Sequence, residues 1–325
     1  MDSEQMTIQI NDVHDLMNRF NLSFKNVVEF QRTKRIVDFL FDDNYLLRIS
    51  HRKLDEIERL QRVQNVSHVP QIHAFGEITI KSSEYHYLIL DYVKGIEMHS
   101  CLSNLSQNQS HEIGEDISRF MLNLQQAKNT NYDIGHYVPI IPQWNHSWKE
   151  GHLTYLKFIE DGLKGLTLSK SGEVAIKEAV DYIKDNAYSL DHMNGPVLLH
   201  NDLHPKNIIL HEGKFMGVID WECSQYGEAD FELIHLFHWS IYPPINGISF
   251  NPLLKSIFEH FTTHVVVPEI SKRLTIYQIE HDLIQLIWNG VKQEQERIMR
   301  INGWLSGQIE SLIKSWSELD ESKGN

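Results

Sequence analysis

Three side chains that carry oxygen ligands stand close together between apolar stretches of this sequence. Asp202 and Asn207 share one short segment, and Asp220 follows the next apolar stretch. Phosphoryl transfer needs a group that orients the attacking hydroxyl and oxygen ligands that hold Mg²⁺ on nucleotide phosphates. The order of these residues therefore predicts phosphoryl-transfer chemistry, with Asp202 at the hydroxyl and Asn207 and Asp220 at the metal.

Short buried strands are expected to position these side chains. Residues 197–199 and 208–210 are rich in leucine and β-branched residues, which favours strands on both sides of the polar segment. The polar residues between them are expected as a loop. Gly213 marks the next turn, and residues 215–219 are expected to return as a strand that ends at Asp220.

Two longer strings of residues extend this pattern. Residues 200–209 read His-Asn-Asp-Leu-His-Pro-Lys-Asn-Ile-Ile, and residues 217–222 read Gly-Val-Ile-Asp-Trp-Glu. They resemble the aminoglycoside phosphotransferase and choline kinase family, whose loop typically reads His-Gly-Asp-Leu-His-Pro-x-Asn and whose fold is similar to that of protein kinases. Residues 226–228 and 231–233 also resemble the stretch that follows in this family, where Glu232 occupies the acidic position at a helix start.

The resemblance implies a kinase of the α+β class with a protein-kinase-like two-lobe fold. A small N-terminal antiparallel sheet with one helix would form the nucleotide-binding lobe, residues 1–93. A larger, mostly helical lobe, residues 94–325, would hold the catalytic and substrate-binding residues. ATP or GTP would donate the phosphate, with Mg²⁺ as cofactor. Asp202 would accept or orient the hydroxyl proton, and His204 would either reach the transferring phosphate or only shape the loop.

The N-terminal part contains candidate nucleotide-binding residues. Arg48, in an expected strand over residues 45–49, falls where the family places the cation that contacts the α- and β-phosphates. That cation is lysine in protein kinases, and arginine keeps the charge but has a planar, forked geometry. Glu56, in an expected helix over residues 53–63, would orient Arg48 through an ion pair, and Glu58 is the alternative partner.

The segment from Asp91 to Gly95 resembles the hinge between the two lobes. Asp91 and Val93 would contact the adenine ring there through main-chain groups. One departure from kinases lies earlier, at residues 31–35, where Gln-Arg-Thr-Lys-Arg contains no glycine. Kinases usually place a flexible glycine loop between their first two strands to cover the phosphates. The three cations of this connection either replace those backbone amides or form a solvated hairpin tip.

Beyond the hinge the sequence becomes mostly helical. Periodic apolar residues predict helices over residues 113–124, 148–159, 174–190, 231–239, 253–261, 276–298 and 301–316. The proline-marked stretch at residues 137–142 is expected as an extended linker.

Charge and composition restrict the partners. The net charge of −14 argues against nucleic acid or an anionic membrane as a partner. Residues 1–100 hold 12 Lys and Arg against 15 Asp and Glu, which leaves a net −11 for residues 101–325. This excess is either a solvated surface or attracts a cationic acceptor. The two cysteines, Cys101 and Cys223, form no disulfide framework, and no signal peptide or membrane span is recognised, so a cytoplasmic protein is expected.

Several alternatives stay open. An aminoglycoside-type antibiotic is the first expected acceptor, and choline-like, homoserine-like or thiosugar-like metabolites are the others. A zinc hydrolase would need several of His200, Asp202, His204, His235 and His238 to converge. A kinase-shaped binding protein without catalysis is the third alternative, which the missing glycines favour and the intact trio of Asp202, Asn207 and Asp220 opposes.

Overall fold

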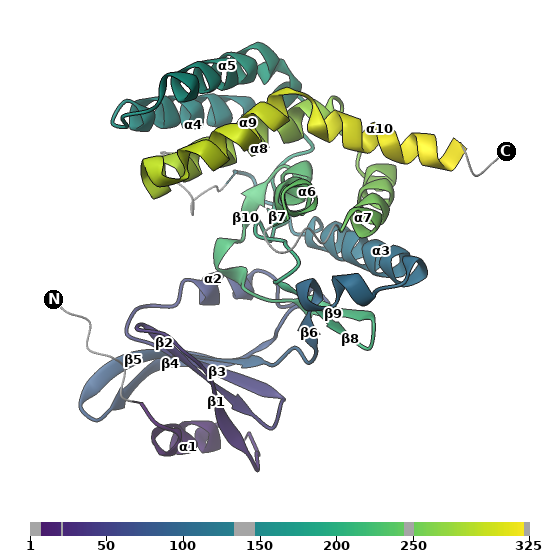
Figure 1. Cartoon of the computed structure of the whole chain (residues 1–325). Coiled ribbons are helices and arrows are strands. Elements are labelled where there is room, and N and C mark those ends of the chain that lie inside the picture. The colour runs from purple at the N-terminus through teal and green to yellow at the C-terminus, as the bar shows by residue number, and fades with distance from the viewer. Residues whose placement is uncertain (1–7, 21, 133–146, 244–249, 322–325) are drawn as a thin grey trace. The chain divides into compact units, whose positions relative to one another are not determined.

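A computed structural model describes residues 8–20, 22–132, 147–243 and 250–321, and the chain divides into two compact units (Figure 1). The sheet unit comprises the chain up to Cys101 together with Lys206–Cys223, and the helical unit comprises Leu102–Pro205 and the chain from Ser224 onward. The division of roles expected between residues 1–93 and 94–325 stays a prediction. The expected linker at residues 137–142 lies outside the described residues.

A five-stranded antiparallel sheet forms the centre of the sheet unit, in the order β1-β2-β3-β5-β4. Its strands are β1 (Val27–Arg32), β2 (Ile36–Phe41), β3 (Tyr45–Ser50), β4 (Ile72–Ile80) and β5 (Ser83–Asp91). Three residues, Asp42 to Asn44, join β2 to β3. Asp42 and Asp43 have φ of 50° and 53°, which the tight turns of hairpin loops use. The resulting register pairs Asp38 with Arg48.

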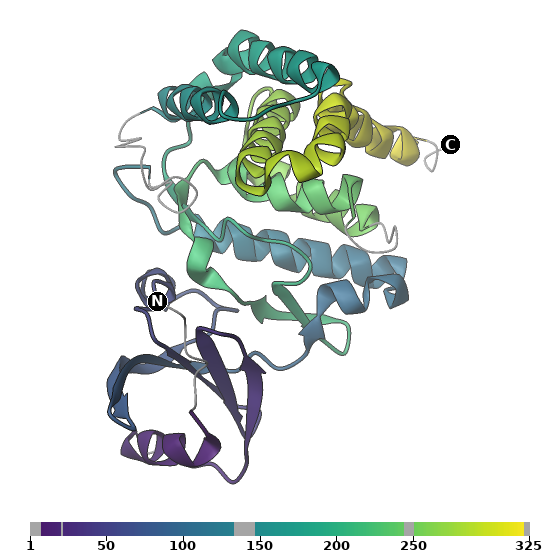
Figure 2. The ribbon, with the colours of Figure 1, turned by 60° about the vertical axis from the view of Figure 1, so that its left-hand side comes forward.

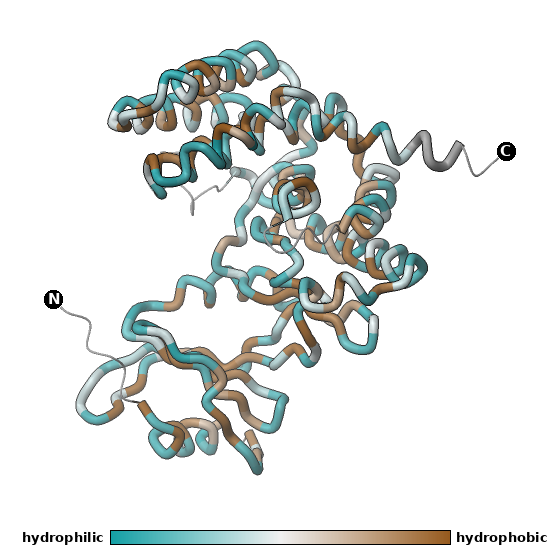
Figure 3. The backbone as a smooth tube through the Cα atoms, in the orientation of Figure 1, coloured by the Kyte–Doolittle hydropathy of each residue, from teal (hydrophilic) through white to brown (hydrophobic). Residues whose placement is uncertain are grey.

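An apolar core holds the sheet against helix α1 (Ile10–Arg19). Figure 2 shows α1 lying along the sheet, and Figure 3 shows the hydrophobic stretches on both elements in brown. Val13 and Met17 of α1 join Phe39 and Ile89 of the sheet in one buried cluster. The second helix of this unit, α2 (Glu56–Gln61), is shorter than the expected helix over residues 53–63.

The segment that returns from the helical unit adds a small second sheet of order β6-β8-β9. It contains β6 (Ile96–Glu97), β8 (Ile208–His211) and β9 (Lys214–Val218). The hairpin expected around Gly213 is confirmed, since Ile208 pairs with Val218 across it. The start of β8 and the end of β9 therefore lie side by side.

The helical unit contains a two-stranded sheet, short 3₁₀ turns and eight α-helices within its described residues. The strands are β7 (Val197–Leu199) and β10 (Gln225–Gly227). The helices are α3 (Gln107–Leu124), α4 (Trp148–Leu163), α5 (Lys170–Asn186), α6 (Ile234–Ile241), α7 (Asn251–His264), α8 (Ile270–Asn289), α9 (Glu294–Leu305) and α10 (Gln308–Glu321). Helix α8 packs against α4, α5, α6, α9 and α10, so it is buried on nearly all sides.

Three helix predictions were wrong in their bounds. The expected helix over residues 301–316 is divided between α9, which ends at Leu305, and α10, which begins at Gln308. The expected helix over residues 276–298 begins earlier, at Ile270, and ends at Asn289. Gly290, at the end of α8, has φ of 67° and ψ of −174°, a conformation outside the helical region that glycine adopts easily, and α9 begins separately at Glu294. The expected helix over residues 231–239 begins with a 3₁₀ turn, Ala229–Leu233, and becomes α-helical only from Ile234.

The α+β class is as predicted, with an antiparallel sheet in one unit and a mostly helical second unit. In the part of the chain that the structure describes, no helix combines the length and the apolar character needed to cross a membrane.

Candidate active site

A buried acid holds the start of the polar loop. After β7 the chain passes through His200 and Asn201, whose backbone N–H groups donate to Glu232 over 2.6 Å and 3.0 Å. Glu232 is 1% exposed. Burial raises the pKa of this carboxyl to about 7, and the two N–H bonds oppose that rise. Glu232 lies in the 3₁₀ turn before α6, so a residue remote in sequence sets the backbone immediately before Asp202.

Two histidines flank the carboxylate of Asp202. Nε2 of His204 lies 3.6 Å from Oδ2, and Nε2 of His235 lies 3.8 Å from Oδ1. Burial lowers the pKa of His235 to about 3, so its ring is neutral near pH 7 and its contact with Asp202 is not an ion pair. The ring of His204 stacks on Trp239 at 4.8 Å. Asp202 is partly exposed.

The two expected metal ligands belong to the sheet unit. Asn207 stands directly before β8 and is buried, and Asp220 follows β9 and is exposed. The backbone N–H of Ile219 donates to the carbonyl oxygen of Asn207 over 2.9 Å. The β8–β9 hairpin thus brings both residues to the same end of the small sheet. Asp220 has φ of 67°, a conformation that is uncommon for a residue other than glycine and frequent at functional sites.

The donor set at this hairpin end fits a magnesium ion. An amide oxygen and a carboxylate are hard ligands, and Mg²⁺ in nucleotide enzymes is typically held by one or two such groups together with substrate phosphates. Across residues 8–20, 22–132, 147–243 and 250–321, no group of three or more His, Cys, Asp or Glu side chains is arranged to hold a metal ion.

Arg48 forms ion pairs with two carboxylates within the sheet unit. Its Nη1 donates to Glu56 over 2.6 Å, and its Nε and Nη2 each donate to Asp38 over 3.1 Å. Burial opposes the charge on Arg48, but the two carboxylates outweigh it and raise the pKa of the guanidinium above its ordinary value. Of the two acids left open, Glu56 is the partner, while Glu58 is exposed and pairs with Arg62 over 2.8 Å.

Sequence reasoning missed Asp38. It lies in β2 among apolar residues and is 2% exposed. A charged residue inside an apolar strand is almost never buried without a partner, and this signal was visible in the sequence. Glu232 was recognised as the acid at a helix start, but which backbone groups it binds was not predicted.

The hinge residues differ in their contacts. The backbone N–H of Asp91 donates to the carbonyl oxygen of Gln71 over 3.0 Å, so this N–H is engaged within the sheet unit. The carboxylate of Asp91 contacts Nε2 of His73 at 2.6 Å. Val93 is half-buried. The assignment of Asp91 and Val93 to nucleotide binding stays a prediction.

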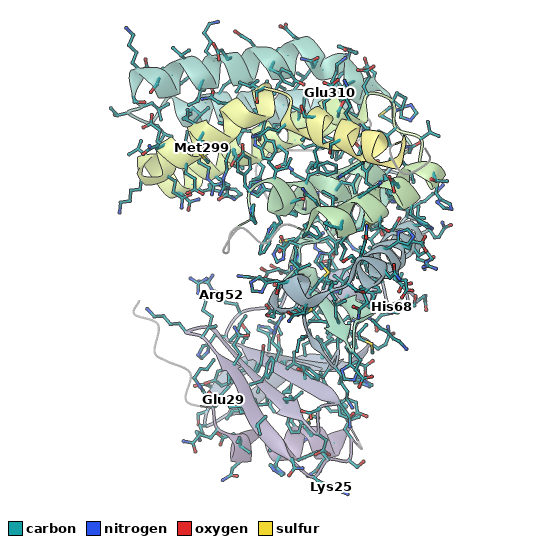
Figure 4. The ribbon with its side chains drawn as sticks, turned by 45° about the vertical axis from the view of Figure 1, so that its right-hand side comes forward. Lys25, Glu29, Arg52, His68, Met299 and Glu310 are labelled. Atoms are coloured by element: carbon teal, nitrogen blue, oxygen red, sulfur yellow. The ribbon has the colours of Figure 1, made fainter. Side chains whose placement is uncertain are left out.

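The connection between β1 and β2 is a tight turn. The backbone N–H of Thr33 donates to the carbonyl oxygen of Ile36 over 2.8 Å. Arg32 pairs with Glu29 at 2.6 Å and donates to the carbonyl oxygen of Ile8; Glu29 is labelled on the sheet unit in Figure 4. Lys34 and Arg35 are exposed. One of the three cations is therefore engaged in the structure of the hairpin itself.

Comparisons with known proteins place the chain in a family. A sequence model described as the phosphotransferase enzyme family matches residues 31–254. The chain belongs to this family, and the prediction of a phosphotransferase from the residues around Asp202 is confirmed. No curated protein sequence matches the chain significantly.

Solved structures confirm the protein-kinase-like fold. A thermostable mutant of aminoglycoside phosphotransferase APH(4)-Ia, in a ternary complex with AMP-PNP and hygromycin B, matches with a TM-score of 0.63 at 16% identity, over 93% of this chain and 97% of that chain. The streptomycin–ATP–APH(2″)-IIa ternary complex matches with a TM-score of 0.62 at 16% identity, over 95% and 99%. ADP-bound APH(2″)-Ib matches with a TM-score of 0.60 at 16% identity, over 94% and 99%.

Proposed function

We propose that this chain is a small-molecule kinase that transfers the γ-phosphate of ATP or GTP to a hydroxyl group. The observation that carries the proposal is the geometry around Asp202. A partly exposed carboxylate stands in a loop whose backbone is held by the buried Glu232, and the same segment continues directly to Asn207. Family membership supports the same chemistry.

Asp202 acts on the acceptor hydroxyl in this proposal. Its carboxylate accepts a hydrogen bond from the hydroxyl and aligns the oxygen with the γ-phosphorus. Because the transition state of phosphoryl transfer is loose, alignment contributes more than early removal of the proton. His235 is neutral and within 3.8 Å of Asp202, so it adds no charge that would weaken the carboxylate as an acceptor. His204, at 3.6 Å, is the second candidate for contact with the transferring phosphate.

The sheet unit holds the donor nucleotide in this proposal. Arg48 is held by Asp38 and Glu56, and it binds phosphate oxygens through the N–H groups of its guanidinium that these acids do not use. Asn207 and Asp220 would hold Mg²⁺, which when bound neutralises charge on the phosphates. The main-chain groups of Asp91 and Val93 would meet the adenine ring.

A cationic acceptor of the aminoglycoside type is the substrate class that we favour. The net charge of −11 in residues 101–325 attracts polycations, and the matching structures contain hygromycin B or streptomycin beside a nucleotide. Choline-like, homoserine-like and thiosugar-like acceptors are the alternatives.

A panel of acceptors tests the proposal. ADP release and ³¹P NMR of the product are measured with ATP and with GTP, using hygromycin B, streptomycin and gentamicin beside choline, homoserine and a thiosugar. The Asp202→Asn variant should lower kcat by at least ~100-fold while calorimetry shows unchanged nucleotide affinity. The control is Asp191→Asn, an exposed acid in the same unit, which should retain full turnover.

Three outcomes separate the alternatives. Near-native turnover by Asp202→Asn contradicts the assigned role of this residue. Turnover of neutral or anionic acceptors alone contradicts a cationic acceptor but leaves the kinase in place. Nucleotide binding without turnover of any acceptor supports the kinase-shaped binding protein instead.

A further inference from the structure

A small cavity lies wholly within the helical unit, beside the loop that carries Asp202. It has a volume of about 30 Å³, and its walls include Asn201, His235, Tyr277 and Glu280. A water molecule needs about 10–15 Å³ measured in this way. The cavity therefore holds about two water-sized atoms, or a substituent of similar size.

Two buried side chains in the wall of this cavity carry polar atoms that have no hydrogen-bond partner among the described residues. Both amide atoms of Asn201 and the Oε1 atom of Glu280 make no hydrogen bond there. Asn201 is 1% exposed and Glu280 is 2% exposed. Buried polar atoms are nearly always paired. Two unpaired groups, from the loop and from α8, at one cavity indicate that a polar group occupies it.

The backbone conformation at position 201 favours glycine, yet the residue there is asparagine. Its φ of 61° lies in the left-handed region, which glycine adopts most easily and asparagine tolerates. Glycine would give the loop the same backbone course without a side chain. The asparagine instead adds a hydrogen-bond donor and acceptor to the cavity, one residue before Asp202.

The unpaired atoms define the chemistry of the occupant. Oδ1 of Asn201 is an acceptor and Nδ2 is a donor, and Oε1 of an ionised Glu280 is an acceptor. Burial raises the pKa of Glu280, and the contact with His152 opposes that rise. The other oxygen of Glu280 contacts His152 at 2.6 Å. Burial lowers the pKa values of His235 and His281, so both rings at the cavity are neutral near pH 7. An occupant with two or more donors and one nearby acceptor satisfies this set, as an amino group beside a hydroxyl or ether oxygen does.

We propose that this cavity binds an amino group of the acceptor and its neighbouring oxygen, while Asp202 orients the hydroxyl that receives the phosphate. The inference rests on the proposed function, which it narrows to acceptors that carry an amino alcohol. His235 links the two places, because it lines the cavity and lies 3.8 Å from Asp202. Glu280 and Asn201 are then specificity-determining residues.

Binding of a matched pair of sugars tests this inference. D-Glucosamine and D-glucose differ only in an amino group that replaces a hydroxyl beside other ring oxygens. Calorimetry of the full chain should show tighter binding of D-glucosamine. Because hydrogen bonds to charged groups are involved, Glu280→Gln and Asn201→Gly should each weaken D-glucosamine roughly 10- to 100-fold and leave D-glucose almost unchanged. Glycine suits the backbone at position 201, so that variant keeps the loop.

A second buried acid on α8 supplies the control. Asp282 pairs with Arg297 and Trp304 and does not line the cavity, so Asp282→Asn should bind both sugars as the unmodified protein does, with thermal melting to confirm its fold. Equal binding of the two sugars, or equal losses for both in Glu280→Gln and Asn201→Gly, overturns the inference and assigns only water to the cavity.

Binding and turnover separate the two proposals. Glu280-dependent binding of D-glucosamine in a protein that phosphorylates no acceptor contradicts the kinase proposal alone. Phosphorylation of acceptors with no dependence on Glu280 or Asn201 contradicts the cavity inference alone.

Discussion

The carboxyl of Glu232 should make stability depend on pH in a defined direction. In the folded chain its pKa is raised from 4.5 to about 7 by burial. The folded state therefore binds this proton more tightly than the unfolded state does. The contribution of the raised Glu232 pKa to the free energy of unfolding is therefore complete below pH 4.5 and is lost as the pH rises to about 7. Replacing Glu232 with glutamine removes this titration and keeps the size of the side chain.

The magnitude follows from the two pKa values. A change from 4.5 to about 7 corresponds to roughly 3 kcal/mol, since each tenfold change in proton affinity is about 1.4 kcal/mol. Urea unfolding of the unmodified chain and of Glu232→Gln, measured from pH 4 to pH 8, gives the difference in their free energies of unfolding. The free energy of unfolding of the unmodified chain minus that of Glu232→Gln should fall by roughly 3 kcal/mol between pH 4.5 and 7. Above pH 7 this difference should stay constant.

An exposed acid provides the reference for this experiment. Glu178 in α5 is exposed, so Glu178→Gln should differ from the unmodified chain by no more than about 0.5 kcal/mol at any pH. A difference curve for Glu232→Gln that is flat, or that rises with pH, would refute the argument, because Glu232 would then not hold its proton more tightly in the folded state.

Three further predictions concern the nucleotide and the acceptor. Asp220→Asn, which tolerates the φ of 67° better than alanine, should weaken Mg²⁺-dependent nucleotide binding in calorimetry, because a neutral amide replaces the charged ligand; undiminished affinity contradicts the metal role. Arg48→Met and Glu56→Gln should each weaken nucleotide binding, and a double-mutant cycle should give a coupling of roughly 0.5–3 kcal/mol, whereas strict additivity excludes a functional pair. The KM for a cationic acceptor should rise with salt while kcat stays level, since the Debye length is only about 8 Å at physiological ionic strength; a salt-independent KM contradicts electrostatic attraction.

The sequence by itself determined the chemistry and the local geometry around it. Short apolar runs rich in leucine and β-branched residues predicted the strands on both sides of the Asp202 loop. The turn at Gly213 predicted the hairpin that brings Asn207 and Asp220 together. These features depend on residues that are near one another in the chain. Backbone preferences and the burial of strands can be predicted from such short stretches of sequence. The match of residues 31–254 to the family model agrees with the predicted chemistry.

Only the tertiary structure decided which distant side chains meet. Asp38 reaches Arg48 because the strand register places them opposite each other, and Glu232 reaches the loop because the turn before α6 lies beside β7. Glu280 and Asn201 share a cavity through the packing of α8 near the loop. These contacts between distant residues cannot be predicted from the spacing of the residues along the chain. These contacts depend on how the buried helices and strands pack. Burying a charge without a partner costs free energy, and the packing decides which partner is within reach.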